Sequence, residues 1–205
     1  ENRELEAERE VARGWFAREN DRRNQLVALE RRKAQMLAGT RRESEQITSA
    51  ALELGERARK LSALLDALYG RSDPGLGGLP IGDFRGLLDW PVEGRVSAEF
   101  GPRVDPRYGT RVPHNGLDLE TVPGSEVRAV YPGKVLFAAP FEGLGQMVVV
   151  QHAGRVFTLY AGLSELRVRK DDVLPLHSIV GRAGSSLYFE IRVDKNPENP
   201  RVWLR

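Results

Sequence analysis

The stretch Leu187-Tyr188-Phe189-Glu190-Ile191-Arg192-Val193 alternates apolar and polar side chains along its whole length. Successive side chains of a β-strand point to opposite faces of the sheet, so this alternation predicts a strand. One face of that strand is apolar and is expected to lie in the core, namely Leu187, Phe189, Ile191 and Val193. The other face is polar, namely Ser186, Tyr188, Glu190 and Arg192.

Similar short runs precede this strand and are separated by turn signals such as Pro132-Gly133 and Ala153-Gly154. Their spacing of about ten residues is typical of antiparallel sheets. Residues 91–205 are therefore predicted to form an antiparallel, mostly-β domain with a core of its own. The clearest of the other runs are residues 127–131, 134–137, 147–151 and 156–160.

A segment containing many glycines and two prolines, residues 70–90, precedes the predicted β domain. This composition is typical of a linker. Phe84, Leu87, Leu88 and Trp90 form an apolar stretch within it. We expect this stretch to dock on the β domain, where it, or part of the upstream helix, would lie across the groove lined by the polar strand face.

Residues 1–69 lack proline and carry apolar residues at heptad spacing, which predicts a helical coiled coil. Two forms fit the pattern: a helical hairpin that turns near Gly39, or one rod of about 100 Å. The pattern is interrupted by polar residues, which are Glu19, Lys33 and Thr40 on one seam and Arg22, Glu43 and Arg57 on the other. The apolar residues are Leu5, Ala12, Leu26, Ile47, Leu54, Leu61 and Leu68 on the first seam, and Trp15, Leu29, Met36, Ala50 and Leu64 on the second.

The composition of the 205-residue chain excludes several classes of protein. The 31 basic residues nearly balance the 29 acidic ones, so the charge indicates no nucleic-acid partner. No apolar run is long enough to span a membrane, and residues 1–10 are too charged for a signal peptide. Cysteine is absent, which excludes disulfides and cysteine–zinc sites and suits an oxidising compartment.

His114-Asn115-Gly116-Leu117-Asp118 places a histidine and a carboxylate four residues apart, directly after a loop rich in glycine and proline. Imidazole nitrogen and carboxylate oxygen are both zinc ligands, but a catalytic zinc site takes three protein ligands and one open position. The pair alone equally fits a histidine hydrogen-bonded to a neighbouring acid.

The residues around this pair resemble those of the LytM/lysostaphin-type zinc endopeptidases, which cleave peptidoglycan cross-bridges. The resemblance covers residues 91–205 and implies their antiparallel β fold, a duplicated hybrid motif. It rests on the segments 91–103, 114–119, 123–127, 133–135, 145–150 and 187–192.

The resemblance also implies that three of the five groups needed for peptidase chemistry are missing. Gly162 stands where the family has an assisting histidine, and Ser186 where it has a catalytic base. Tyr188 stands where the family has its third zinc ligand, and a phenol with a pKa near 10 is a poor ligand at neutral pH. We therefore expect no enzyme activity and no cofactor, with His114 and Asp118 as the remnant of a metal site.

The segment 186–192 and the order of coiled coil, linker and degenerate domain resemble the EnvC-type murein hydrolase activators. This resemblance implies an exported, periplasmic or envelope protein that activates a cell-wall zinc amidase during daughter-cell separation. It also implies coupling to a division-site membrane complex through the coiled coil, which is expected to self-associate as well. Two alternatives stay open: a residual zinc endopeptidase built on His114 and Asp118, and a module that binds peptidoglycan. The expected partner-binding groove consists of Asn115, Asp118, Leu144, Met147, Ser186, Tyr188, Glu190 and Arg192.

Overall fold

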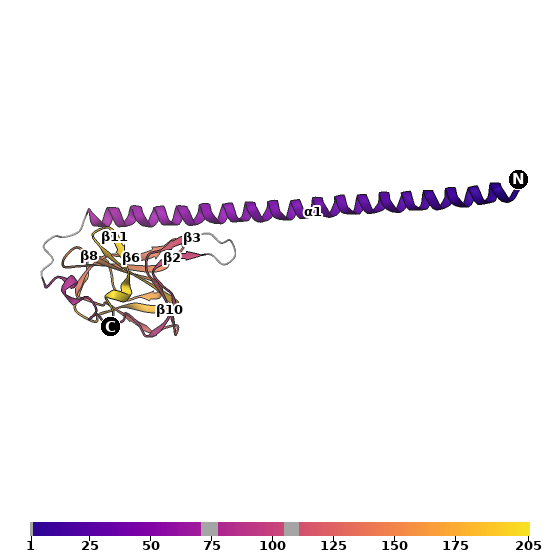
Figure 1. Cartoon of the computed structure of the whole chain (residues 1–205). Helices are drawn as coiled ribbons and strands as arrows, with labels where there is room; N and C mark the ends of the chain where they lie inside the picture. The colour runs from indigo at the N-terminus through magenta and orange to yellow at the C-terminus, as the bar shows by residue number, and fades with distance from the viewer. Residues whose placement is uncertain (1, 71–77, 105–110) are drawn as a thin grey trace. The chain divides into compact units, whose positions relative to one another are not determined.

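A computed structural model describes residues 2–70, 78–104 and 111–205 (Figure 1). Residues 71–77 of the predicted linker lie outside the described residues. The chain divides into two compact units, Glu1–Leu54 and Gly55–Arg205. The boundary falls within the N-terminal helix rather than in the linker, because the last turns of that helix pack on the β-sheet. No helix among the described residues is long and apolar enough to cross a membrane.

The N-terminal segment is one continuous helix, α1 (Asn2–Tyr69), so of the two forms considered the single helix is present. Gly39 does not interrupt it, since one glycine costs only about 1 kcal/mol in a helix interior. Large apolar side chains of the predicted seams remain exposed in the first unit; Leu29 and Met36 are 61% and 68% exposed. The long helix is thus confirmed, and the coiled coil stays a prediction.

The predicted antiparallel sheet is confirmed. Among the described residues nine strands form one sheet, and the long strand β10 (Ile179–Val193) lies near its centre. Across the sheet the strand order is β1 (Gly94–Ala98), β4 (Leu117–Thr121), β10, β8 (Val156–Leu166), β7 (Gly145–His152), β6 (Gly133–Phe141) and β9 (Val173–Leu174). Two short strands, β5 (Glu126–Arg128) and β11 (Asn196–Glu198), also pair with β10. A separate hairpin consists of β2 (Gly101–Val104) and β3 (Arg111–His114).

Both faces of the sheet are covered by apolar packing. The first face includes Leu187, Phe189 and Ile191, which are fully buried as the alternation predicted, and Val193, the fourth predicted residue, is partly buried against them. The second face carries residues of the neighbouring strands β7 and β8, among them Met147, Phe157 and Leu159. A sheet with two buried faces accounts for the nearly continuous apolar run in β7, where a one-sided sheet would show strict alternation.

The apolar segment before the first strand packs on the first face of the sheet. Ile81, in the short helix η1 (Ile81–Phe84), is fully buried, and Leu88 forms a bridge with Leu204. Trp203 follows the C-terminal turn η2 (Pro200–Val202) and lies in the same cluster. The expected docking of the segment on the β domain is confirmed, but the segment does not lie across the groove, because Tyr188 belongs to the opposite face.

A buried polar chain runs through the β domain beside this first core. His152 is fully buried, with Nδ1 2.8 Å from the Pro132 carbonyl oxygen and Nε2 2.8 Å from the Thr158 hydroxyl. The Thr158 and Tyr160 hydroxyls lie 3.1 Å apart. Because a carbonyl only accepts, Nδ1 carries a hydrogen. Burial lowers the pKa of His152 to about 4.

The free energy of unfolding is expected to decrease by about 3 kcal/mol as the pH falls from 6.5 to 4, through this histidine alone. The unfolded chain takes up the proton near pH 6.5, whereas the folded chain does so only near pH 4. The stability is therefore complete above pH 6.5 and is lost as the pH falls. Denaturant titrations of the wild type and of His152→Gln test this. The variant should show a clearly shallower pH dependence in this window; parallel curves would contradict the assignment.

Candidate functional site

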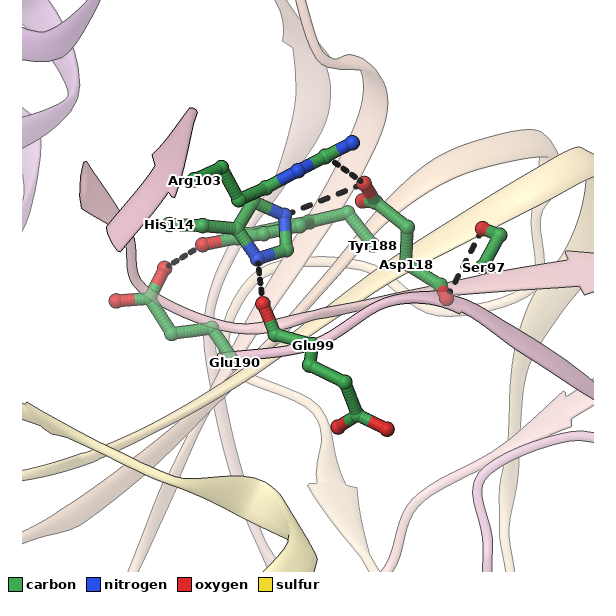
Figure 2. Close-up of polar contacts among 7 residues, drawn as sticks. All are labelled: Ser97, Glu99, Arg103, His114, Asp118, Tyr188 and Glu190. Carbon is green, nitrogen blue, oxygen red and sulfur yellow. Dashed lines mark hydrogen bonds and ion pairs between the residues drawn. The ribbon is translucent and has the colours of Figure 1, made fainter. Parts of the chain in front are cut away.

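The histidine–aspartate pair predicted from the sequence comes together where the β2–β3 hairpin joins the sheet (Figure 2). His114 ends β3 and Asp118 lies in β4, with His114 Nε2 3.2 Å from Asp118 Oδ2. His114 Nδ1 lies 2.9 Å from the backbone oxygen of Glu99, which can only accept. Nδ1 therefore carries a hydrogen, and Nε2 is the nitrogen directed at the carboxylate.

Arg103 supplies a cation to the same carboxylate. Its Nη1 lies 3.4 Å from Asp118 Oδ2, the oxygen that also faces His114 (Figure 2). Ser97 donates a hydrogen bond of 3.2 Å to the backbone oxygen of Asp118 and so fixes this part of β4. The carboxylate is thus held between an imidazole and a guanidinium group, which is an arrangement that needs no metal ion to neutralise its charge.

Tyr188 lies directly beside the pair because β10 pairs with β4 and places Tyr188 opposite Asp118. Its ring packs edge-on against the His114 ring, with 5.7 Å between the centroids. Its hydroxyl donates a 2.6 Å hydrogen bond to Glu190 Oε2. Burial raises the pKa of the Tyr188 phenol, and the Glu190 carboxylate adds to this rise. The phenol therefore remains protonated at neutral pH.

Gly116 permits this close packing of β10 against the turn before β4. A Cβ atom at position 116 would lie 2.4 Å from the backbone oxygen of Phe189 and 2.9 Å from the Tyr188 ring. Both distances are shorter than van der Waals contact, so no larger residue fits without a shift of the strand. The glycine of the His-Asn-Gly sequence therefore sets the approach of Tyr188 to the histidine.

Glu190 and Arg192 form a buried ion pair next to Tyr188. Glu190 is fully buried and Arg192 is 9% exposed. Arg192 Nε donates to Glu190 Oε1 at 2.5 Å, and Nη1 donates to the Lys195 backbone oxygen at 3.3 Å. Burial raises the pKa of Glu190, against the opposing effect of the Arg192 cation. Both residues belong to the polar strand face predicted from the alternation, and both are buried there.

The last turns of α1, residues 61–69, cover this second face of the sheet. Leu65 and Leu68 are 2% and 6% exposed and pack with Met147 and Phe157. The Tyr69 ring packs edge-on against Phe157 with 4.4 Å between centroids. Burial raises the pKa of Tyr69 to about 12, an effect that the nearby Arg192 cation opposes. We call residues 61–69 the cover segment.

Polar contacts flank the cover segment. Asp66 Oδ1 lies 3.0 Å from Lys195 Nζ, and Lys60, one residue before the segment, pairs with Glu142. These charged groups are mostly exposed, so they orient the helix more than they stabilise it. The sequence carries one signal of this docking: four leucines, Leu61, Leu64, Leu65 and Leu68, crowd the last two turns of an otherwise polar helix.

The remaining predicted groove residues differ in accessibility. Met147 is fully buried beneath the cover segment, and Leu144 is partly buried in the same cluster. Asn115 is partly buried, and Ser186 is exposed. Arg103 and Glu99, which contact the histidine–aspartate pair, lie in segment 91–103 of the resemblance but were not assigned to the site, because their contacts depend on how the β2–β3 hairpin meets the sheet.

The donor set does not fit the zinc ion that the His-x-x-x-Asp pattern implies. A catalytic zinc ion needs three protein ligands, and here the third neighbour is a protonated phenol already bonded to Glu190. Within residues 2–70, 78–104 and 111–205, no group of three or more histidine, cysteine, aspartate or glutamate side chains is arranged to hold a metal ion.

Residues 112–200 match the sequence profile described as Peptidase family M23. The β unit carries a Peptidase M23 domain of the LytM type. The DD-carboxypeptidase/endopeptidase Mpg of Neisseria meningitidis is 37% identical over 112 residues, which are 52% of this chain and 26% of that protein. The murein hydrolase activator EnvC of Escherichia coli K12 is 32% identical over 131 residues, 60% of this chain and 30% of EnvC.

A solved structure agrees with this assignment. The crystal structure of a zinc-containing peptidase from Vibrio cholerae aligns with a TM-score of 0.53 at 26% identity, covering 57% of this chain and 40% of that one. The chain thus spans less than half the length of each of these proteins. Their names include both hydrolases and an activator of hydrolases, so the domain alone does not distinguish the two roles.

Proposed function

We propose that this chain is a non-catalytic regulator of peptidoglycan hydrolysis, which binds a cell-wall zinc amidase during cell-wall remodelling and daughter-cell separation. The observation that carries the proposal is the Tyr188–Glu190 hydrogen bond, because it occupies the third-ligand position with a group that cannot bind zinc at neutral pH. Of the two relatives named above, one is by name a DD-carboxypeptidase/endopeptidase and the other a murein hydrolase activator.

The backbone at Gly162 supports a non-catalytic role. Its φ of +81° lies in the left-handed region, and a Cβ there would lie 2.6 Å from the Ser186 backbone oxygen. The assisting histidine expected from the resemblance would therefore need a change of backbone as well as of side chain. Ser186 stands where the resemblance implies a catalytic base. A serine hydroxyl is itself a weak nucleophile unless a neighbouring base activates it, and the resemblance implies no such base beside Ser186.

The cover segment suggests how such a regulator is held inactive. It occupies the face that carries Tyr188, Glu190 and Arg192, so a partner reaches that face only when residues 61–69 move away. Unrestrained activation of an amidase would damage the cell wall, which gives this restraint a purpose. In this proposal the chain works in the cell envelope, where the wall lies.

A residual zinc endopeptidase is the second candidate, favoured by the preserved approach of His114 Nε2 to Asp118 Oδ2 at 3.2 Å. Two ligands are too few for a catalytic zinc ion, so this candidate requires a third ligand that the described residues do not supply. Zinc affinity therefore separates the two candidates.

Zinc titration by calorimetry is expected to show no stoichiometric binding to the wild-type chain. Replacing Tyr188→His adds a third ligand beside His114 and Asp118 and should increase zinc affinity by about 100-fold or more. The matched control Tyr188→His/Asp118→Asn should lose this gain. Stoichiometric zinc binding by the wild type that disappears in His114→Ala would instead support the residual endopeptidase.

A further inference from the structure

In the first unit an apolar seam of α1 is exposed, and none of the described residues covers it. Leu26, Leu29 and Met36 are 56%, 61% and 68% exposed, and they lie at heptad spacing on one side of the helix. Heptad seams of this kind are buried by a second helix. The polar residues that interrupt the seam decide which helix that is.

A parallel, in-register pair of two copies is unfavourable. In that arrangement each seam residue meets its own counterpart, so Lys33 would face Lys33 and Glu43 would face Glu43 of the second copy. Glu19 and Arg22 would also each face a like charge. Like charges in a helix interface are destabilising, and here they would recur along most of the first unit.

An antiparallel pair removes these conflicts in one register. Reversing the second helix brings the first seam opposite the second seam, and Lys33 then lies opposite Glu43 of the second copy. The same register pairs apolar or small residues in the neighbouring layers, which are Leu26–Ala50, Leu29–Ile47 and Met36–Thr40, and it places Arg22 beside Leu54. A shift by one heptad in either direction leaves Lys33 opposite Met36 or Ala50 and loses the ion pair.

Two further features of the helix suit this register. The two-fold axis that relates the two helices passes at Ala38, next to Gly39. No described residue requires a glycine at position 39, since nothing lies within 4 Å of a Cβ built there. Small residues at the crossing point allow two helices to approach closely. Thr40, one of the polar seam residues, donates its hydroxyl to the Met36 backbone oxygen at 3.0 Å and so brings no unsatisfied group into the interface.

We propose that residues 22–54 of α1 bind the same residues of a second copy of this chain as an antiparallel coiled coil, with Lys33 of each copy opposite Glu43 of the other. The proposal rests on the exposed seam and on the charge complementarity of that one register. It is independent of the function proposed for the β unit.

Sedimentation velocity of the full chain over a range of concentrations tests the pairing. The wild type should dimerise, and Lys33→Glu or Glu43→Lys should each raise the dissociation constant by about 10-fold or more. The double variant Lys33→Glu/Glu43→Lys restores opposite charges and should return to within about threefold of the wild type. Arg31→Glu, which changes the same charge outside the seam, is the matched control and should leave the constant unchanged.

A spin label tests the orientation, because the chain has no cysteine and Ser49→Cys gives a single attachment site. In the antiparallel register the two labels lie about 33 Å apart, from the rise of 1.5 Å per residue. In a parallel pair they lie within about 20 Å. A wild-type chain that stays monomeric, a double variant that fails to recover, or the shorter label distance would each overturn the proposal. If the chain is monomeric, we infer that the seam binds a different protein, such as a membrane complex.

Discussion

The double variant Leu65→Asp/Leu68→Asp is expected to bind a cell-wall amidase about tenfold or more tightly than the wild-type chain does. Leu65 and Leu68 are almost fully buried against Met147 and Phe157, and a carboxylate at either position cannot be buried there without a large cost. The cover segment should therefore leave the sheet. In the wild type only the uncovered fraction of molecules binds, and that fraction lowers the apparent affinity.

Amidase titration and hydrogen exchange of the same samples check this expectation together. Exchange should increase in residues 61–69 of the variant and in the part of β7 beneath them. Leu52→Asp is the matched control, because Leu52 lies on the same helix but is 67% exposed, and it should change neither measurement. If the cover segment exchanges freely and the amidase affinity stays at the wild-type value, this face does not bind the amidase.

Replacing Arg192→Met should lower the free energy of unfolding by about 3–5 kcal/mol. Among the described contacts of the fully buried Glu190 carboxylate, Arg192 is the only cation, and the change removes it. A buried charge without a partner is costly. Denaturant unfolding followed by circular dichroism measures the loss. The loss in free energy of unfolding is large only if the cover segment keeps Glu190 buried, so its size shows whether residues 61–69 lie on the sheet.

The double variant Glu190→Gln/Arg192→Met should recover most of that stability. Its glutamine is neutral and still offers an oxygen to the Tyr188 hydroxyl, so no buried charge remains. Arg95→Met is the matched control: Arg95 pairs with Glu120 on the surface, and its loss should change stability far less. Equal effects of the Arg192 and Arg95 changes would show that the buried pair is open to solvent.

Local patterns were sufficient to predict parts of β5, β6, β7, β8 and β10 and one face of the sheet. The alternation in residues 187–193 assigned Leu187, Phe189 and Ile191 to the core, and burial confirms this. The same alternation could not show that Glu190 and Arg192 are buried as well. Their burial depends on helix residues more than one hundred positions away in the chain, and strand periodicity carries no information about such a contact.

The candidate site shows the same limit. The sequence singled out His114 and Asp118 as either a metal-site remnant or a hydrogen-bonded pair, and the structure places them 3.2 Å apart. The contacts of Arg103 and the Glu99 backbone oxygen depend on how the β2–β3 hairpin meets the sheet, which no local pattern specifies. Likewise, the linker composition indicated a connection, and only the packing of Ile81 and Leu88 shows that it joins the first core.

Release of dye from labelled, purified peptidoglycan tests the central claim most directly. The samples are this chain alone, a cell-wall amidase from the same cell alone, and the two together, each with the wild type and with Leu65→Asp/Leu68→Asp. The account predicts no release by either form of the chain alone, and more release by amidase with the uncovered variant than with the wild type. Release by the chain alone that a chelator abolishes would contradict the account and show that this M23 domain is itself a peptidase.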